Sequence, residues 1–177
     1  MGVVVRPADQ PGDLGWMVWQ NGEVYAATLG WDRSYDALVA RIVADYAAAP
    51  PDPRLGGWIA ELDGRRVGCV LCVPAPDSPD TAVLRILLVT PDARGHGAGA
   101  ALVSACLDHA RTAGCRAVTL WTNDILTSAR RIYEAEGFEL VGSEAHHSFG
   151  KDLVGQNWRL DLGSVGVGQA TVARTSR

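Results

Sequence analysis

The chain has 177 residues, and its 16 Lys and Arg against 20 Asp and Glu give a formal net charge of −4. Hydrophobic residues make up 47% and charged residues 20%, which is typical of one globular domain with a full core. The acidic balance, without a long basic run, argues against nucleic acid or an acidic membrane surface as a partner. The N-terminus matches no secretory or myristoylation pattern, and no apolar run approaches the roughly 20 residues of a membrane span. We therefore expect a cytoplasmic protein.

The first third of the sequence predicts a strand and two helices. Val3 to Arg6 favours a short strand, and a helix is expected to begin near Leu14. The segment from Gly30 to Arg33 breaks this helix. Ser34 is expected to cap a second helix, which Pro50-Pro51 ends.

The middle of the chain predicts three consecutive strands. Trp58 to Leu62 and Arg66 to Val73 flank Asp63-Gly64, a strong hairpin signal. Thr81 to Val89 follows a turn-rich loop and is apolar enough for burial on both faces.

The remaining chain alternates helices and strands, which indicates a partly parallel sheet. One helix is expected to end at Gly114, and another is expected to be capped by Thr127 or Ser128 and to end at Gly137. The strands of this part are expected at 116–121, 138–141 and 157–162. Residues 163–177 are expected to form a loosely ordered tail.

The cysteines do not form a zinc motif. Cys69 and Cys72 are spaced as C-x-x-C but lie in a predicted strand, where residues three apart point to opposite faces. Cys106 and Cys115 are not the close second pair of a zinc site. We expect four buried structural thiols and no bound metal.

A glycine-rich segment carries the strongest chemical signal. Arg94-Gly95-His96-Gly97-Ala98-Gly99 joins the strand that ends at Val89 to a helix. Glycines allow close backbone approach, and the free amides and dipole of a helix N-terminus bind phosphate groups. The segment therefore predicts a phosphate or pyrophosphate site.

Two nucleotide motifs compete for this site. Gly95-x-Gly97-x-x-Ala100 satisfies the dinucleotide fingerprint, with Asp124 as the ribose-binding acid. However, Thr90 to Arg94 separate the glycines from the strand, and too little chain follows for a doubly wound sheet. A mononucleotide P-loop is excluded because Asp152 follows the only Gly-Lys pair.

The same segment resembles the Arg/Gln-x-x-Gly-x-Gly/Ala signature of the GNAT superfamily of acyl-CoA-dependent N-acetyltransferases. The resemblance extends from the predicted strands through Val89-Thr90-Pro91 to the segment 129–138, which is similar to the second motif of that family. It implies a single α/β domain over residues 1–162, with a mixed, mostly antiparallel sheet and a central parallel splay flanked by helices. The segment 146–158 resembles the acetyltransferase half of proteins that fuse a MarR-type DNA-binding domain to a GNAT domain; no DNA-binding half is expected here.

The resemblance implies acetyl-CoA as co-substrate, with no metal. Backbone amides of the glycine segment would hold the pyrophosphate, and the central strand would pair with the pantetheine. The family's second motif often has an Asn that contacts the cofactor; Leu126 stands there, and Asn123 or Ser128 could replace it. The expected cofactor-binding residues are Leu87, Leu88, Val89, Arg94, Gly95, His96, Gly97, Ala98, Gly99, Ala100 and Asn123.

Tyr133 matches the tyrosine that many GNAT enzymes use as general acid to the departing thiolate. The general base is open, because the central strand carries Arg85 where some relatives place a glutamate. Candidate bases are Glu61, His146 and His147. The expected acceptor-binding residues are Trp31, Glu61 and His146, with Tyr35 as a further wall candidate. Arg130 and Arg131 are candidates for contact with a CoA phosphate.

The sequence therefore predicts N-acetylation of a primary amine, by direct attack on the thioester. The acceptor is either a small molecule or a protein amine, and a homodimer is left open. The alternative is a non-catalytic acyl-CoA-binding sensor or partner module, which needs neither Tyr133 nor a base. A dinucleotide-binding oxidoreductase is the third hypothesis.

Overall fold

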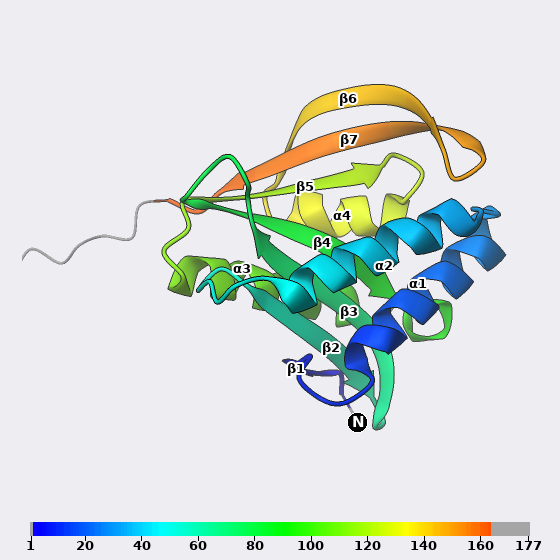
Figure 1. Ribbon diagram of the computed structural model, residues 1–177, viewed down its shortest axis with the longest axis horizontal. Helices are drawn as coiled ribbons and strands as arrows, with labels where there is room; N and C mark the ends of the chain where they lie inside the picture. The colour runs from blue at the N-terminus through cyan, green and yellow to red at the C-terminus, as the bar shows by residue number, and fades with distance from the viewer. Residues whose placement is uncertain (1, 164–177) are drawn as a thin grey trace, which may run out of the picture.

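The computed structural model describes residues 2–163 and has one seven-stranded sheet between two pairs of helices (Figure 1). Residues 164–177, nearly all of the predicted tail, lie outside the described residues. The strands, in chain order, are β1 (Val4–Pro7), β2 (Gly56–Leu62), β3 (Arg65–Pro74), β4 (Thr81–Val89), β5 (Ala117–Asn123), β6 (Glu139–Ser148) and β7 (Lys151–Asp161). The helices are α1 (Asp13–Leu29), α2 (Arg33–Ala48), α3 (Ala98–Thr112) and α4 (Thr127–Ala135), with the short 3-10 turn η1 (Pro91–Ala93).

The sheet is antiparallel except at its centre. Its order is β1-β2-β3-β4-β5-β7-β6, and β4 and β5 form the one parallel pair among the described strands. This pairing joins Thr81–Leu84 to Ala117–Leu120 and stops there, although β4 continues to Val89 and β5 to Asn123. The two strands separate beyond this point, which confirms the predicted central splay.

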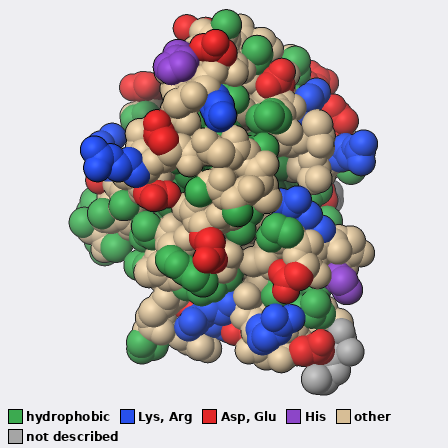
Figure 2. Space-filling view, turned by 90° about the vertical axis from the view of Figure 1, so that its right-hand side faces the viewer, with side chains coloured by type: hydrophobic (Ala, Val, Ile, Leu, Met, Phe, Trp, Pro, Cys, Tyr) green, Lys and Arg blue, Asp and Glu red, His purple; other side chains and the backbone are tan. Residues whose placement is uncertain are grey.

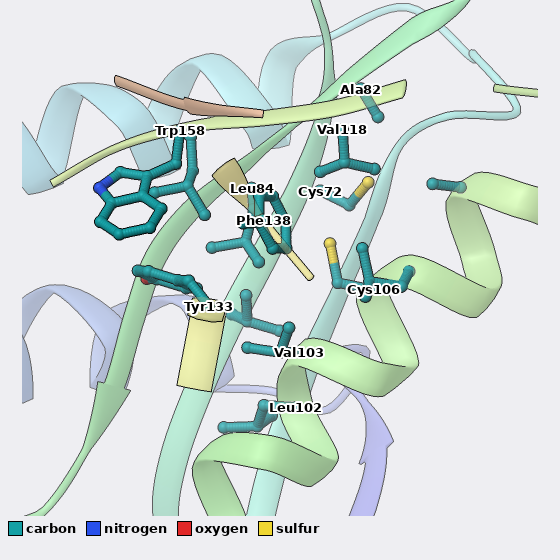
Figure 3. Packing of buried hydrophobic residues seen from close by; sticks show 14 of the residues in the cluster. Cys72, Ala82, Leu84, Leu102, Val103, Cys106, Val118, Tyr133, Phe138 and Trp158 are labelled. Carbon is teal, nitrogen blue, oxygen red and sulfur yellow. The ribbon is translucent and has the colours of Figure 1, made fainter. Parts of the chain in front are cut away.

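Two apolar layers hold the helices against the two faces of the sheet. Helices α1 and α2 pack on one face, with Met17, Val39 and Leu71 fully buried there. Helix α3 packs with α4 on the other face, around Leu102 and Val103 (Figure 3). The apolar positions of each helix thus form one buried stripe.

The predicted cysteine environment is confirmed. All four thiols are free and buried. Cys69 belongs to the core under α1 and α2, whereas Cys72 belongs to the core under α3. The strand geometry therefore separates them, as residues three apart on a strand require.

A β-bulge interrupts β4 where it leaves β5. Cys69 pairs with Leu88 and Leu71 pairs with Arg85, so Ile86 and Leu87 together oppose one residue of β3. Ile86 has a φ of 49°, rare for a β-branched residue. The bulge turns Ile86 toward α1 and α2 and Leu87 toward α3 and α4.

The sequence underestimates the last hairpin. The sequence predicts strands at 138–141 and 157–162, but β6 pairs from Glu139 to Ser148 with Lys151 to Arg159 of β7, around the turn at Phe149-Gly150. Both turn residues have positive φ, 59° and 75°, as in a type I′ hairpin turn. Phe149 is an unusual residue for this turn, and the mostly exposed β6 has no alternating apolar pattern.

Two predicted helix caps are wrong. Asp32, not Ser34, caps α2, since its carboxylate accepts a hydrogen bond from the Ser34 amide at 2.9 Å. The N-cap of α4 is Leu126, which has no side-chain capping bond. Within the described residues, no helix is long and apolar enough to cross a membrane.

Candidate active site

Two adjoining cavities open along the splay between β4 and β5. The larger, about 590 Å³, lies between α1, the glycine segment and α4. The smaller, about 340 Å³, lies between α1, α2, β4, β5 and the β6–β7 turn. Four residues line both cavities: Tyr25, Leu87, Leu126 and Ala129. A ligand chain in the larger cavity can therefore reach the smaller one.

The glycine segment forms one end of the larger cavity. Gly95 and Gly97 have φ values of 83° and 82°, a left-handed conformation that glycine adopts without strain. Gly97 is the N-cap of α3 and provides no side-chain cap. Within the described residues, no acceptor binds the amides from Gly95 to Ala100, and the first amide bonded at this end of α3 is that of Ala101. Free amides at a helix N-terminus are suited to bind an anion.

Gly99 has a packing role beside this site. A Cβ there would lie 2.5 Å from Cδ1 of Ile132 and 3.5 Å from Cγ2 of Val89. The glycine thus lets α4 and the end of β4 approach α3 closely, which closes the larger cavity around its anion site.

The side chains of Arg94 and Arg131 also line the larger cavity. Neither makes an ion pair or a hydrogen bond within the described residues. Arg130, by contrast, donates a hydrogen bond to the Asp124 carbonyl at 3.0 Å and lies over the Trp158 ring. Arg94 and Arg131 are the cationic side chains of the described chain that line this cavity. On the face seen in Figure 2, cationic and acidic side chains are interspersed.

Tyr133 lies on α4 and lines the smaller cavity next to the shared wall. Its ring packs edge-on against Phe138, with centroids 5.7 Å apart, and is close to Leu84 and Trp158 (Figure 3). Its hydroxyl makes no hydrogen bond within the described residues. Burial raises the pKa of this hydroxyl well above its ordinary value, so it stays protonated at neutral pH.

An aromatic cluster forms the wall of the smaller cavity opposite β4. Trp31 contacts Tyr25, Tyr35 and Phe149, with ring centroids 4.8 to 5.0 Å apart. All four rings line the cavity. Arg85 of β4 lines it too. The structure thus brings the predicted wall residues Trp31 and Tyr35 to the cavity that meets Tyr133.

Asn123 lies at the smaller cavity, not at the larger one where the sequence interpretation placed it. Its Oδ1 is 2.8 Å from Nε2 of His146, whose Nδ1 is 3.0 Å from the Ser148 hydroxyl. His146 itself lines neither cavity. Ser128, the other candidate for the missing motif residue, lines the larger cavity.

The structure brings none of the three candidate bases to a cavity wall. Glu61 accepts a hydrogen bond from Arg6 at 2.7 Å at the β1 edge. His147 is exposed and pairs with Asp152. No Asp, Glu or His of the described chain lines either cavity.

Two expected cofactor contacts also lie outside the cavity walls. The Leu88 side chain is buried in the core under α1 and α2. The His96 ring is exposed, with Nδ1 3.2 Å from the carbonyls of Ala93 and Arg94. Leu88 can therefore reach a ligand in either cavity through its backbone only.

Sequence reasoning missed one of the residues that join the two cavities. Tyr25 lines both, yet no motif distinguishes it from a core residue. The sequence does distinguish Arg85, because it is the one charged residue of a strand that is otherwise apolar apart from Thr81.

Comparison with known proteins places this site in a family context. Residues 25–138 match the profile of the Acetyltransferase (GNAT) family. Camello of Xenopus tropicalis, a probable N-acetyltransferase, is 38% identical over 82 residues, which are 46% of this chain and 37% of that protein. The L-2,4-diaminobutyric acid acetyltransferase of Nocardia farcinica is 42% identical over 60 residues, 34% of this chain and 31% of that enzyme. The matches thus span less than half of these relatives.

Solved structures show the same fold at low identity. Protein yncA of Salmonella typhimurium, solved with its cofactor acetyl-CoA, has a TM-score of 0.72 and 18% identity, covering 96% of this chain and 99% of that one. A ribosomal-protein-alanine N-acetyltransferase from Brucella melitensis has the same TM-score and identity, covering 90% and 99%.

Proposed function

The chain belongs to the GNAT family of acetyltransferases, and on that premise we propose that it transfers an acetyl group from acetyl-CoA to a primary amine. The domain is proposed to span residues 1–162. The observation that carries the proposal is the pair of adjoining cavities, one with an anion site and one with a buried tyrosine, which meet where β4 and β5 separate.

The larger cavity fits acetyl-CoA, which supplies the acyl group as a thioester. The unbonded amides from Gly95 to Ala100 suit its pyrophosphate. Arg94 and Arg131 add cations for its phosphates. Beyond Leu84, β4 is no longer paired with β5, so the backbone from Leu87 to Val89 is proposed to pair with the pantetheine amides.

Tyr133 is proposed to act as general acid. Its raised pKa keeps the proton on the hydroxyl at neutral pH, and no protein group competes for that proton. Tyr133 lines the smaller cavity, and its neighbour on α4, Ala129, lines both cavities, which supports a role for the hydroxyl at the junction where thioester and acceptor are proposed to meet.

The acceptor is proposed to enter the smaller cavity as a neutral amine. No carboxylate or imidazole of the described chain lines this cavity, so a solvent water is the proposed proton acceptor. A volume of about 340 Å³ is at the low end for ligand sites, which favours a small molecule over a protein segment. The name of the Nocardia farcinica relative, an amino acid acetyltransferase, also supports a small acceptor.

The test begins with calorimetric titration of acetyl-CoA, CoA and NAD into the purified protein. We expect saturable binding of acetyl-CoA and CoA and none of NAD. Thiol release is then measured against a panel of small amines for the wild type and Tyr133→Phe. We expect the variant to bind acetyl-CoA normally and to lose about 10²-fold or more in kcat, as removal of a general acid does.

Each result has a distinct meaning. Absence of acetyl-CoA binding would refute the proposal, and binding of NAD would restore the dinucleotide hypothesis. Normal turnover in Tyr133→Phe would remove this tyrosine from the mechanism. Binding of acetyl-CoA without thiol release for any acceptor would favour the non-catalytic sensor instead.

A further inference from the structure

Arg85 is a cation without a protein counter-charge in the smaller cavity. It lies in the middle of β4 and is half-buried. Within the described residues, its guanidinium makes no hydrogen bond and no ion pair. Partial removal of this charge from water costs free energy, which an anionic partner would offset.

The β4 backbone fixes this placement. Arg85 pairs with Leu71, a residue of the core under α1 and α2, so its side chain starts on that face of the sheet. The bulge that follows keeps Ile86 on the same face. Arg85 is thus directed to the wall formed by the aromatic cluster, and away from the glycine segment on the other side of the splay.

No acid among the described residues forms an ion pair with Arg85. The cavity is lined by apolar and aromatic residues, Thr122 and Asn123, without an Asp or Glu of the described chain. Asp45, on the exposed side of α2, is the one acid that acts on Arg85 electrostatically, and it forms no ion pair with it. Burial lowers the pKa of Arg85 from its ordinary value, which shows the desolvation of the guanidinium.

A second hydrogen-bond donor, in the opposite wall of the cavity, lacks a protein partner. The indole Nε1 of Trp31 is buried and has no acceptor within the described residues. An indole N–H and a guanidinium are donors only. The guanidinium of Arg85, which lines the cavity, therefore complements a ligand group that offers oxygen acceptors.

We propose that Arg85 makes this site selective for acceptor amines that also carry a carboxylate, such as amino acids. A planar carboxylate can accept two hydrogen bonds from the guanidinium, and the partly desolvated position strengthens the pair. Amines without an anionic group, such as polyamines, would place a positive charge beside an unpaired arginine and bind poorly. The phosphates of acetyl-CoA do not satisfy Arg85, because the proposed pyrophosphate site lies in the other cavity.

This inference rests on the proposed function for the reaction, but its binding step can be tested alone. The probes are the standard amino acids, each compared with its own amide, which keeps the amine and the side chain and removes the carboxylate charge. Binding is measured by calorimetry in the presence and absence of saturating CoA, and thiol release is measured with acetyl-CoA. The proteins are the wild type, Arg85→Gln, Arg85→Lys and the control Arg41→Gln.

Arg41→Gln makes the same change of charge on the exposed side of α2, away from both cavities. We expect at least one amino acid to bind the wild type about 10-fold or more tightly than its amide, the effect of one charge-assisted hydrogen bond. Arg85→Gln should remove this preference and leave amide binding unchanged. Arg85→Lys should retain part of it, because it keeps the charge but not the planar fork. Arg41→Gln should behave as the wild type.

The outcomes separate the two proposals. Amino acid binding that depends on Arg85, without any acetyl-CoA binding, would support the inference and refute the proposed function. The inference alone would be overturned if acetyl-CoA binds but each amino acid binds no more tightly than its amide, or if no amino acid binds at all. The inference would also be overturned if Arg85→Gln weakens the binding of amino acids and of their amides by the same factor and Arg85→Lys does the same. That result would assign Arg85 a structural role.

Discussion

At the residue scale, two tyrosine hydroxyls of the smaller cavity have opposite environments. Tyr35 donates a hydrogen bond to Oδ1 of Asn21 at 3.1 Å, and Asn21 is fully buried, with Nδ2 bonded to the Met17 carbonyl. The Tyr133 hydroxyl makes no hydrogen bond within the described residues, although its ring is buried. A hydroxyl that the fold does not use is available for chemistry.

We therefore predict that the two Tyr→Phe variants differ in stability. Tyr35→Phe leaves the Asn21 acceptor unsatisfied and should cost about 1–2 kcal/mol of unfolding free energy. Tyr133→Phe should change it by less than about 0.5 kcal/mol, because no internal bond is lost. Urea unfolding of both variants and the wild type measures the difference. A Tyr133→Phe protein that is destabilised as much as Tyr35→Phe would mean that this hydroxyl is part of the fold.

At the scale of single elements, a charge at the N-terminus of α3 is expected to affect both the stability of the helix and the binding of the ligand. Ala100 is exposed, lies in the first turn and lines the larger cavity. An acidic side chain there would interact favourably with the helix dipole by about 0.3–1 kcal/mol. The same charge would repel a pyrophosphate held by the neighbouring amides.

Ala100→Glu is therefore expected to be as stable as the wild type or slightly more so, and to bind acetyl-CoA about 10-fold or more weakly. Ala100→Gln is the matched control, because it has nearly the same size without the charge. Thermal unfolding and calorimetric titration give the two quantities. If the two variants lose affinity equally, bulk and not charge is responsible, and the assignment of the anion to this helix end is unsupported.

The elements differ in how far the sequence predicts them. The glycine segment was interpretable because three glycines between a strand and a helix have few other physical explanations. The β6–β7 hairpin was underestimated, since Phe149 occupies a left-handed turn position that sequence rules reserve for Gly, Asn or Asp. The shared wall at Tyr25 and Leu126 depends on where β4 and β5 separate, which depends in turn on the bulge at Ile86. No local pattern encodes such a long-range register.

At the scale of the whole molecule, a buried ionic network joins the N-terminal segment to the sheet. The Asp13 carboxylate, fully buried at the start of α1, accepts hydrogen bonds from Arg6 of β1 at 2.7 and 3.0 Å and from Arg66 of β3 at 2.8 Å. Arg6 also pairs with Glu61 of β2. These bonds, the largest contribution coming from Arg6, lower the pKa of Asp13. The network thus fixes α1, and with it one wall of both cavities.

Because a buried partner removed from an ion pair leaves an uncompensated charge, Asp13→Asn should lose about 3 kcal/mol of unfolding free energy at neutral pH. The lowered pKa sets the sign of the pH dependence: the Asp13 contribution is full above the unfolded value of about 4 and is lost as pH falls through the lower folded value. The difference in unfolding free energy between the wild type and Asp13→Asn, measured by urea unfolding, should therefore be constant from about pH 7 to 5 and shrink below about pH 4. Asp108→Asn, which removes an exposed ion pair with Arg111 on α3, should cost less than about 1 kcal/mol throughout. A gap for Asp13→Asn that persists undiminished in acid would show that the site contributes through packing and not through charge.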